Sequence, residues 1–157
     1  MTMINTANKI IAIVVMLVGL SSVSNVSAHG GATGVVKQRM DAMSDMADAM
    51  KAMALVVKGK KEFNRELFIE SGELIAGHSN MLPDLFPEGS VKGSSEALPV
   101  IWQQWNDFVS ISDRAKSNAE EMMKMAQDGS KLRPLIKQFV KIGGDCKACH
   151  KDYRKKK

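Results

Sequence analysis

The residues best suited to chemistry lie near the end of the 157-residue chain, in the run Cys146-Lys147-Ala148-Cys149-His150. It contains the only two cysteines of the sequence, and a histidine directly follows the second one. This C-x-x-C-H pattern is the attachment signature of a c-type haem. The spacing lets two thiols add to the two vinyl groups on one porphyrin edge, and the adjacent imidazole can then bind the iron. The motif therefore predicts one covalent haem c, attached through Cys146 and Cys149, with His150 as an axial ligand.

Other interpretations of the same residues are weaker. A thioredoxin-like redox pair needs a strand-to-helix setting, and no segment of this sequence alternates as a strand does. A structural zinc site needs four ligands, and beyond the motif the only histidines are His29 and His78. We expect His78 to be a surface or loop residue. An ordinary disulfide remains chemically possible.

Residues 1–28 have the layout of a secretory signal peptide. Lys9 is their only charge, residues 10–20 are an unbroken apolar run, and residues 21–28 are small and polar. The apolar run is shorter than the roughly 18 residues needed to span a bilayer, which argues against a retained membrane anchor. We predict cleavage after Ala28, so that an exported domain of residues 29–157 remains.

The overall composition fits one globular domain. Apolar residues make up 45% of the sequence and charged residues 25%, which excludes a disordered or collagen-like chain. Two cysteines exclude a multiply bridged scaffold. The formal charge of +5 is only a mild basic bias, and two haem propionates bring it closer to neutral, so nucleic acid is not an expected partner.

The elements that must position the motif are helices. Apolar residues recur at steps of three and four, which predicts helices over 34–58, 63–81, 99–127 and 132–153, with a long crossover loop over 82–98. One apolar stripe on each helix predicts an all-α fold, an antiparallel up-down-up-down four-helix bundle with the haem near its carboxyl end. In this order the start of the first helix lies beside the end of the last.

With these motifs in place, the sequence resembles the class II cytochromes c, the cytochrome c prime family. The residues that carry the resemblance are the segment 146–154, Leu85-Phe86-Pro87 with Gly89, Ile101-Trp102 before Phe108, and Arg39 followed four residues later by Met43. The resemblance implies a periplasmic monohaem protein with His150 as the proximal ligand. It also implies that Arg39 and Trp102 lie near the haem edge and propionates.

The family has a high-spin branch without a sixth protein ligand and a low-spin branch with a methionine on the iron. The predicted first helix has five methionines: Met40, Met43, Met46, Met50 and Met53. Most are expected to be core residues, because thioethers fill irregular gaps well. Those near the start of the helix lie closest to His150, which favours Met40 and Met43. Met43 lies on both apolar heptad lines and matches the ligand position of the low-spin relatives, so we predict Met43 as the distal ligand and Met40 as the alternative.

The expected function is therefore a periplasmic, low-spin cytochrome that carries one electron between redox proteins. The first alternative is a five-coordinate haem protein that binds or scavenges nitric oxide or carbon monoxide. A distant one is a methionine-rich copper-binding protein, which would leave the C-x-x-C-H motif unexplained. No catalytic constellation is visible, so an enzyme is not expected. We expect no stable membrane anchor, and a monomer or a homodimer. The basic residues 154–157 are a solvated terminus or guide an acidic partner.

Overall fold

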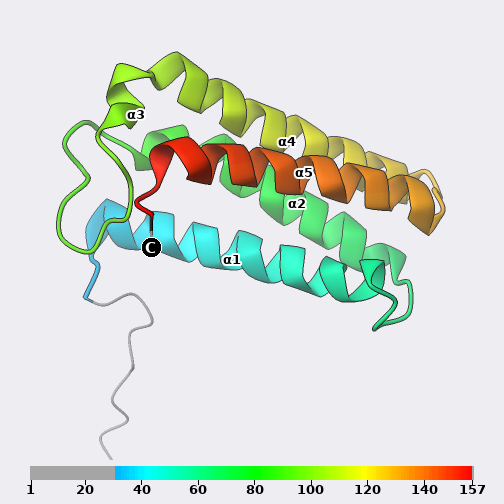
Figure 1. Cartoon of the computed structure of the whole chain (residues 1–157). Helices are drawn as coiled ribbons and strands as arrows, with labels where there is room; N and C mark the ends of the chain where they lie inside the picture. Colours follow the sequence, from blue (N-terminus) through cyan, green and yellow to red (C-terminus); the bar gives the residue numbers. More distant parts are fainter. Residues whose placement is uncertain (1–30, 157) are drawn as a thin grey trace, which may run out of the picture.

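The computed structural model describes residues 31–156, which form helices and loops apart from one isolated β-bridge between Ala97 and Arg154. The helices are α1 (Gly34–Val57), α2 (Arg65–Met81), the short 3-10 helix η1 (Pro83–Leu85), α3 (Val100–Gln103), α4 (Trp105–Gln127) and α5 (Leu132–Tyr153). In Figure 1 the long helices α1, α2, α4 and α5 lie side by side and alternate in direction. The predicted all-α four-helix bundle is confirmed. The predicted signal peptide, residues 1–28, lies outside the described residues.

The ends of the helices follow the signals in the sequence. After α1 the chain turns at Gly59, whose φ of 66° is in the left-handed region that glycine adopts freely. The Asn64 side chain then caps α2 by accepting a hydrogen bond from the backbone N–H of Glu66 at 3.0 Å. Gly129, at a φ of 86°, makes the turn between α4 and α5. The predicted boundaries of the first, second and fourth helices therefore agree with the structure to within two residues.

The third predicted helix differs from the structure. It is interrupted at Gln104, whose φ of −120° and ψ of 37° lie outside the helical region, so α3 and α4 are separate helices. The Tyr153 hydroxyl at the end of α5 donates to the Asp107 carboxylate at 2.7 Å and contacts the Gln104 side-chain oxygen at 3.3 Å. This contact from a distant part of the chain accompanies the break, which periodicity within residues 99–127 could not reveal.

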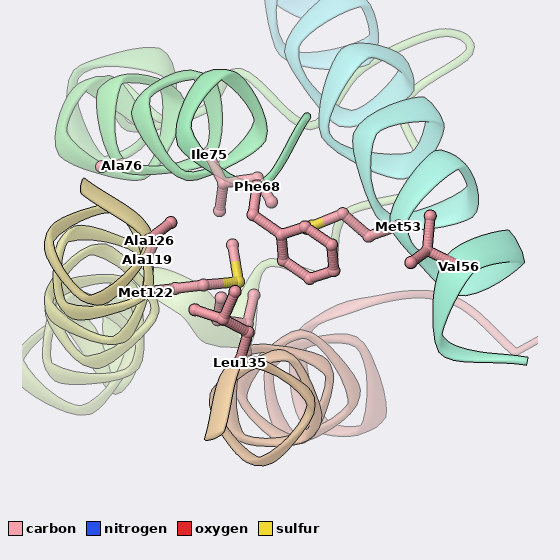
Figure 2. Close-up of a cluster of buried hydrophobic side chains, with 10 residues drawn as sticks. Met53, Val56, Phe68, Ile75, Ala76, Ala119, Met122, Ala126 and Leu135 are labelled. Carbon is pink, nitrogen blue, oxygen red and sulfur yellow. The ribbon is translucent and has the colours of Figure 1, made fainter. Parts of the chain in front are cut away.

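The end of the bundle away from the C-x-x-C-H motif is filled by a hydrophobic core to which all four long helices contribute. Phe68 of α2 lies at its centre in Figure 2, with Met53 of α1 on one side and Met122 of α4 on the other. All three side chains are completely buried. Met53 is thus a core residue, as was expected for most of the first-helix methionines.

A second core cluster lies near the carboxyl end of α5. Its buried members come from α1, η1 and the segments beside it, α3, α4 and α5: Ala42, Leu82, Leu85, Phe86, Ile101, Phe108, Ile111 and Tyr153. The Phe108 ring packs edge-to-face on the rings of Phe86 and Tyr153, with centroids 4.9 and 5.5 Å away. These contacts fix the end of α5 against α4 and the loop that follows η1.

Within residues 31–156 no helix is both long enough and apolar enough to cross a bilayer.

Candidate haem site

The last turns of α5 place the three donors of the motif around one space. Cys146, Cys149 and His150 all belong to α5, where residues three and four apart lie on the same side of a helix. All three line a cavity of about 350 Å³ that also borders α2, here called the α2-side cavity. Both cysteines are unpaired and partly buried. The helix therefore presents both thiols and the imidazole to a common cavity.

A second cavity, of about 330 Å³, lies on the other side of the same residues and borders the loop before α3. It is here called the loop-side cavity. Four residues line both cavities: Met43, Ala47, Cys149 and His150. The other walls are largely apolar, with Phe86, Ile101 and Phe108 around the loop-side cavity and Ile75, Leu82 and Ile111 around the α2-side cavity. Each volume is within the range of roughly 300–1,000 Å³ that small-molecule and cofactor pockets occupy. The two spaces together suit a broad, mainly apolar group.

The methionines of α1 differ in where they lie. Met43 lines both cavities, whereas Met40 lines only the loop-side cavity and Met46 and Met50 line only the α2-side cavity. The start of α1 is therefore beside the end of α5, as the bundle topology predicted. Of these methionines in the described residues, Met43 alone shares both spaces with His150.

Arg39 lies one helical turn before Met43 and is only 4% exposed. Its guanidinium donates to the Ser90 carbonyl at 2.8 Å and the Ser90 hydroxyl at 3.1 Å, and makes a longer contact of 3.4 Å with the Ser95 hydroxyl. It also lies over the Phe86 ring, 4.4 Å from the centroid. Burial lowers the pKa of Arg39 from its usual value. Arg39 is thus a buried cation in the wall of the loop-side cavity.

The loop that forms the remaining wall is tied to the end of the chain. Glu96 pairs with Arg154, whose Nε donates to the carboxylate at 2.8 Å. The Leu98 N–H donates to the Tyr153 carbonyl at 2.9 Å, and the Lys155 side chain donates to the Ser95 carbonyl at 2.8 Å. The sequence analysis missed Ser90, Ser95 and Glu96, because loop residues carry no periodic signal that could place them.

Comparison with known proteins gives the family. Residues 34–154 match the family model described as Cytochrome C'. A cytochrome c' of Rhodopseudomonas palustris is 32% identical over 126 residues, covering 80% of this chain and 84% of that protein. A cytochrome c-556 of Agrobacterium tumefaciens is 31% identical over 125 residues, covering 79% and 99% respectively.

The chain belongs to the cytochrome c' family.

Solved structures of cytochromes c' have the same fold. Cytochrome c' from R. palustris superposes with a TM-score of 0.74 at 31% identity, covering 80% of this chain and 99% of that one. A nitric oxide complex of a cytochrome c prime mutant from Alcaligenes xylosoxidans gives a TM-score of 0.70 at 31% identity, with 78% and 94% covered.

As a cytochrome c' family member, the protein carries one covalently attached haem c, and its own residues fit this group. Two thiols, an imidazole and a thioether line the two cavities. Thiols attach haem c covalently, and imidazole and thioether groups ligate haem iron. The rest of the walls is apolar enough to receive a porphyrin. The predicted roles of Cys146, Cys149 and His150 are consistent with this placement.

The electrostatics of the motif keep its three donor side chains uncharged. Burial, Cys146 and Asp152 raise the pKa of the Cys149 thiol to about 12, and burial and Asp145 raise that of Cys146. Burial and the nearby Arg154 lower the pKa of His150. His150 is therefore neutral at pH 7 and keeps a nitrogen lone pair, which an iron ligand requires.

Trp102 lies next to Phe86, one of the residues that line the loop-side cavity. The lining of the two cavities does not include Trp102 itself, and its indole N–H donates to the Phe86 carbonyl at 2.9 Å. Because the Phe86 ring in turn supports the Arg39 guanidinium, Trp102 acts on the loop-side cavity through Phe86. A direct contact of Trp102 with the haem edge stays a prediction from the resemblance.

Asp145 was not recognised from sequence, and His78 lies in a different setting from the expected one. Asp145, beside Cys146, is buried in the wall of the α2-side cavity and accepts hydrogen bonds from Asn118 at 2.7 Å and Arg114 at 3.3 Å. His78, expected on the surface or in a loop, is instead a partly buried residue of α2 whose Nε2 lies 3.2 Å from the Asp45 carboxylate of α1. It lines neither cavity.

Proposed function

We propose that the protein is a periplasmic one-electron carrier whose haem iron is held by His150 from α5 and Met43 from α1. The observation that carries this proposal is that Met43 lines both cavities together with His150. When bound, the haem supplies a reversible one-electron iron couple. A thioether opposite an imidazole favours reduced iron and raises the reduction potential, and two protein ligands limit rearrangement on electron transfer. Both properties suit a carrier without substrate turnover of its own.

The surrounding residues support this role. Phe86, Ile101 and Phe108 give the loop-side cavity apolar walls, and Arg39 is fixed there by Ser90 and Ser95. A guanidinium presents two parallel N–H donors that match the two oxygens of a carboxylate. Arg39 lines this cavity, and we propose that its remaining N–H groups hold a haem propionate.

The location in the periplasm is proposed from the signal peptide that residues 1–28 predict. The partners proposed there are redox proteins that give and receive single electrons.

A second function is favoured by one of the similar structures, the nitric oxide complex of a cytochrome c prime mutant. In that case Met43 would pack beside the iron without ligating it, and the open sixth position would bind nitric oxide or carbon monoxide. The two functions differ in one property, the occupancy of that position.

Optical spectra of the reduced holoprotein with and without carbon monoxide test the proposal. We expect a low-spin spectrum that carbon monoxide does not change, and a Met43→Ala variant that is high-spin and binds the gas. The matched control is Met40→Ala, which removes the same side chain one turn earlier on α1 and should leave the low-spin spectrum intact. Rapid gas binding by the unaltered protein would instead support the second function, and a low-spin Met43→Ala variant would exclude Met43 as the ligand.

A further inference from the structure

The outer face of α5 carries a row of cations. Five exposed residues form it, here called the basic stripe: Arg133, Lys137, Lys141, Lys147 and Lys151. At about 100° per residue they fall within an arc of roughly 120°, and they extend for about 27 Å along the helix. Nothing covers the helix surface between them at Gly144, which is exposed on the same face and where a Cβ would meet nothing within 4 Å. The stripe is therefore a continuous and accessible surface.

The charge of the stripe is not balanced by its surroundings. None of its five cations makes an ion pair within residues 31–156, whereas Lys37, Lys51 and Lys124 each pair with an aspartate on their own helix or at its end. Like charges four residues apart on a helix repel, and the stripe contains three such pairs. This repulsion disfavours α5 as a helix, so the stability of the helix does not explain why these five cations lie together on its exposed face.

The exposed faces of α2 and α4 have the opposite character. The exposed charged residues of α2 are all acidic, namely Glu66, Glu70 and Glu73. On α4 the exposed acids Asp107, Asp113, Glu120 and Glu121 outnumber the exposed cations Arg114 and Lys124. Among the four long helices, exposed cations without an ion pair within residues 31–156 are therefore concentrated on α5, the helix that carries the two cysteines of the motif.

We propose that the basic stripe is the docking surface for a redox partner protein with an acidic surface. This rests on the proposed electron-carrier function and names the class of partner. Lys147 lies between the two cysteines and Lys151 directly follows His150, so the stripe is the outer side of the turns whose inner side holds the haem. A partner on the stripe is separated from the inner face of α5 by about one helix diameter, roughly 10–12 Å.

The stripe suits an acidic protein better than an anionic membrane. A helix that binds at a membrane surface buries an apolar face among the lipids, whereas the apolar face of α5 is buried in the bundle, with Leu135 and Ile142 fully covered. Val140, 63% exposed, is the one large apolar side chain on the stripe face. A cationic surface of this kind increases the rate at which an acidic partner is encountered and becomes less effective as salt rises.

The test measures electron transfer into the oxidised holoprotein from reduced flavodoxin, an acidic flavoprotein, by stopped flow between low and high ionic strength. The variant is Lys137→Glu/Lys141→Glu/Lys151→Glu, which leaves Lys147 within the haem motif unchanged. The matched control is Lys58→Glu/Lys60→Glu/Lys61→Glu, which makes the same change in charge at exposed positions of the α1–α2 turn. Reduced lumiflavin, a small uncharged flavin, serves as a second electron donor that needs no docking.

At low salt we expect flavodoxin to transfer electrons to the stripe variant at least about tenfold more slowly than to the unaltered protein. The rate for the stripe variant should also depend much less on salt. The turn variant should change the rate by less than about threefold. With lumiflavin all three proteins should react at similar rates. Circular dichroism and the haem spectrum confirm that the variants are folded. The corresponding Lys→Gln triple variant of the stripe should slow electron transfer from flavodoxin in the same direction but by a smaller factor.

Three outcomes would overturn the proposal. Equal losses in the stripe and turn variants would mean that only net charge matters. Loss of binding to vesicles containing phosphatidylglycerol with an unchanged flavodoxin rate would assign the stripe to a membrane. Loss of self-association in sedimentation with an unchanged rate would assign it to a second copy of the chain. Failure of lumiflavin to reduce the unaltered holoprotein is distinct from these, because it would refute the electron-carrier function itself.

Discussion

Two glycines of α2 allow a matched test of the packing that supports the α2-side cavity. A Cβ on Gly72 would lie 2.9 Å from the Met123 Cβ, 3.0 Å from the Ala119 carbonyl oxygen and 3.2 Å from the Met123 backbone nitrogen. A Cβ on Gly77 would meet nothing within 4 Å. Gly72→Ala therefore forces α2 and α4 apart, whereas Gly77→Ala fills open space on the same helix.

The magnitudes follow from two opposed effects. Alanine in place of glycine within a helix stabilises by about 0.5–1 kcal/mol when the new methyl group meets no obstacle, which is the expectation for Gly77→Ala. At Gly72 the obstacles are backbone atoms and a Cβ, which cannot rotate away. Overpacking of this kind costs about 1–3 kcal/mol. Because the gain in helix propensity is common to both variants, they should differ by the overpacking cost of about 1–3 kcal/mol in the free energy of unfolding.

Thermal and urea unfolding of the holoprotein at pH 7 measure this difference. At roughly 3–5 °C per kcal/mol for a domain of this size, Gly77→Ala should melt a few degrees above the unaltered protein and Gly72→Ala below it. Gly72→Ala should also disturb the haem spectrum, because Ile75 of α2 and Ala115 of α4 line the α2-side cavity close to this contact. If Gly72→Ala were as stable as Gly77→Ala, the close approach of α2 and α4 would not exist as described.

Further predictions concern buried polar groups. Burial and the Asp107 hydrogen bond raise the pKa of Tyr153 from 10.0 to about 12. The neutral phenol is therefore favoured in the folded protein, and its contribution of about 2–3 kcal/mol is complete below pH 10 and lost as pH rises through 12. Urea unfolding at pH 9 and 11 should show about half of this loss, about 1.4 kcal/mol, in the unaltered protein and none of it in Tyr153→Phe. Equal losses in both proteins would contradict the prediction. Arg39→Leu removes the donors to Ser90 and Ser95 and should lower stability by about 1–3 kcal/mol, with faster proteolysis of the loop over 86–98; unchanged proteolysis would refute this anchoring role. Asp145→Ala leaves the Asn118 amide without its acceptor. If urea unfolding showed the free energy of unfolding to fall by well under 1 kcal/mol, water would replace the carboxylate in that variant.

The fold was predictable because its information is local. The steps of three and four from Val36 to Val57 specify an amphipathic helix without reference to the rest of the chain, and Gly129 marks a turn by itself. The break at Gln104 was not predictable in this way. Its side chain meets Tyr153, which is distant in sequence, and no pattern within residues 99–127 encodes that contact.

The residues of the candidate site also differ in whether their positions follow from local sequence or from distant contacts. The placement of Cys146, Cys149 and His150 around one cavity was predictable, because residues three and four apart share one side of a helix. The position of Met43 beside His150 required the bundle topology as well, since it depends on α1 starting where α5 ends. Ligation of the iron by Met43 stays a prediction. The partners of Arg39 belong to a loop, where side-chain positions follow from the packing of the whole domain rather than from sequence period.

The position of the two cavities bears on how the bundle is held together. Between the carboxyl end of α5 and the start of α1, the two cavities occupy space that side chains fill elsewhere in the bundle, and Met43, Ala47, Cys149 and His150 form their shared boundary. A haem attached to α5 and ligated by Met43 would therefore join the first and last helices where protein contacts are few. On this basis Met43→Ala should reduce the hydrogen-exchange protection of the amides at the start of α1 more than that of α2 or α4, whereas Met40→Ala should not. Equal loss of protection in all four helices would indicate that the haem stabilises the bundle as a whole and not through this link.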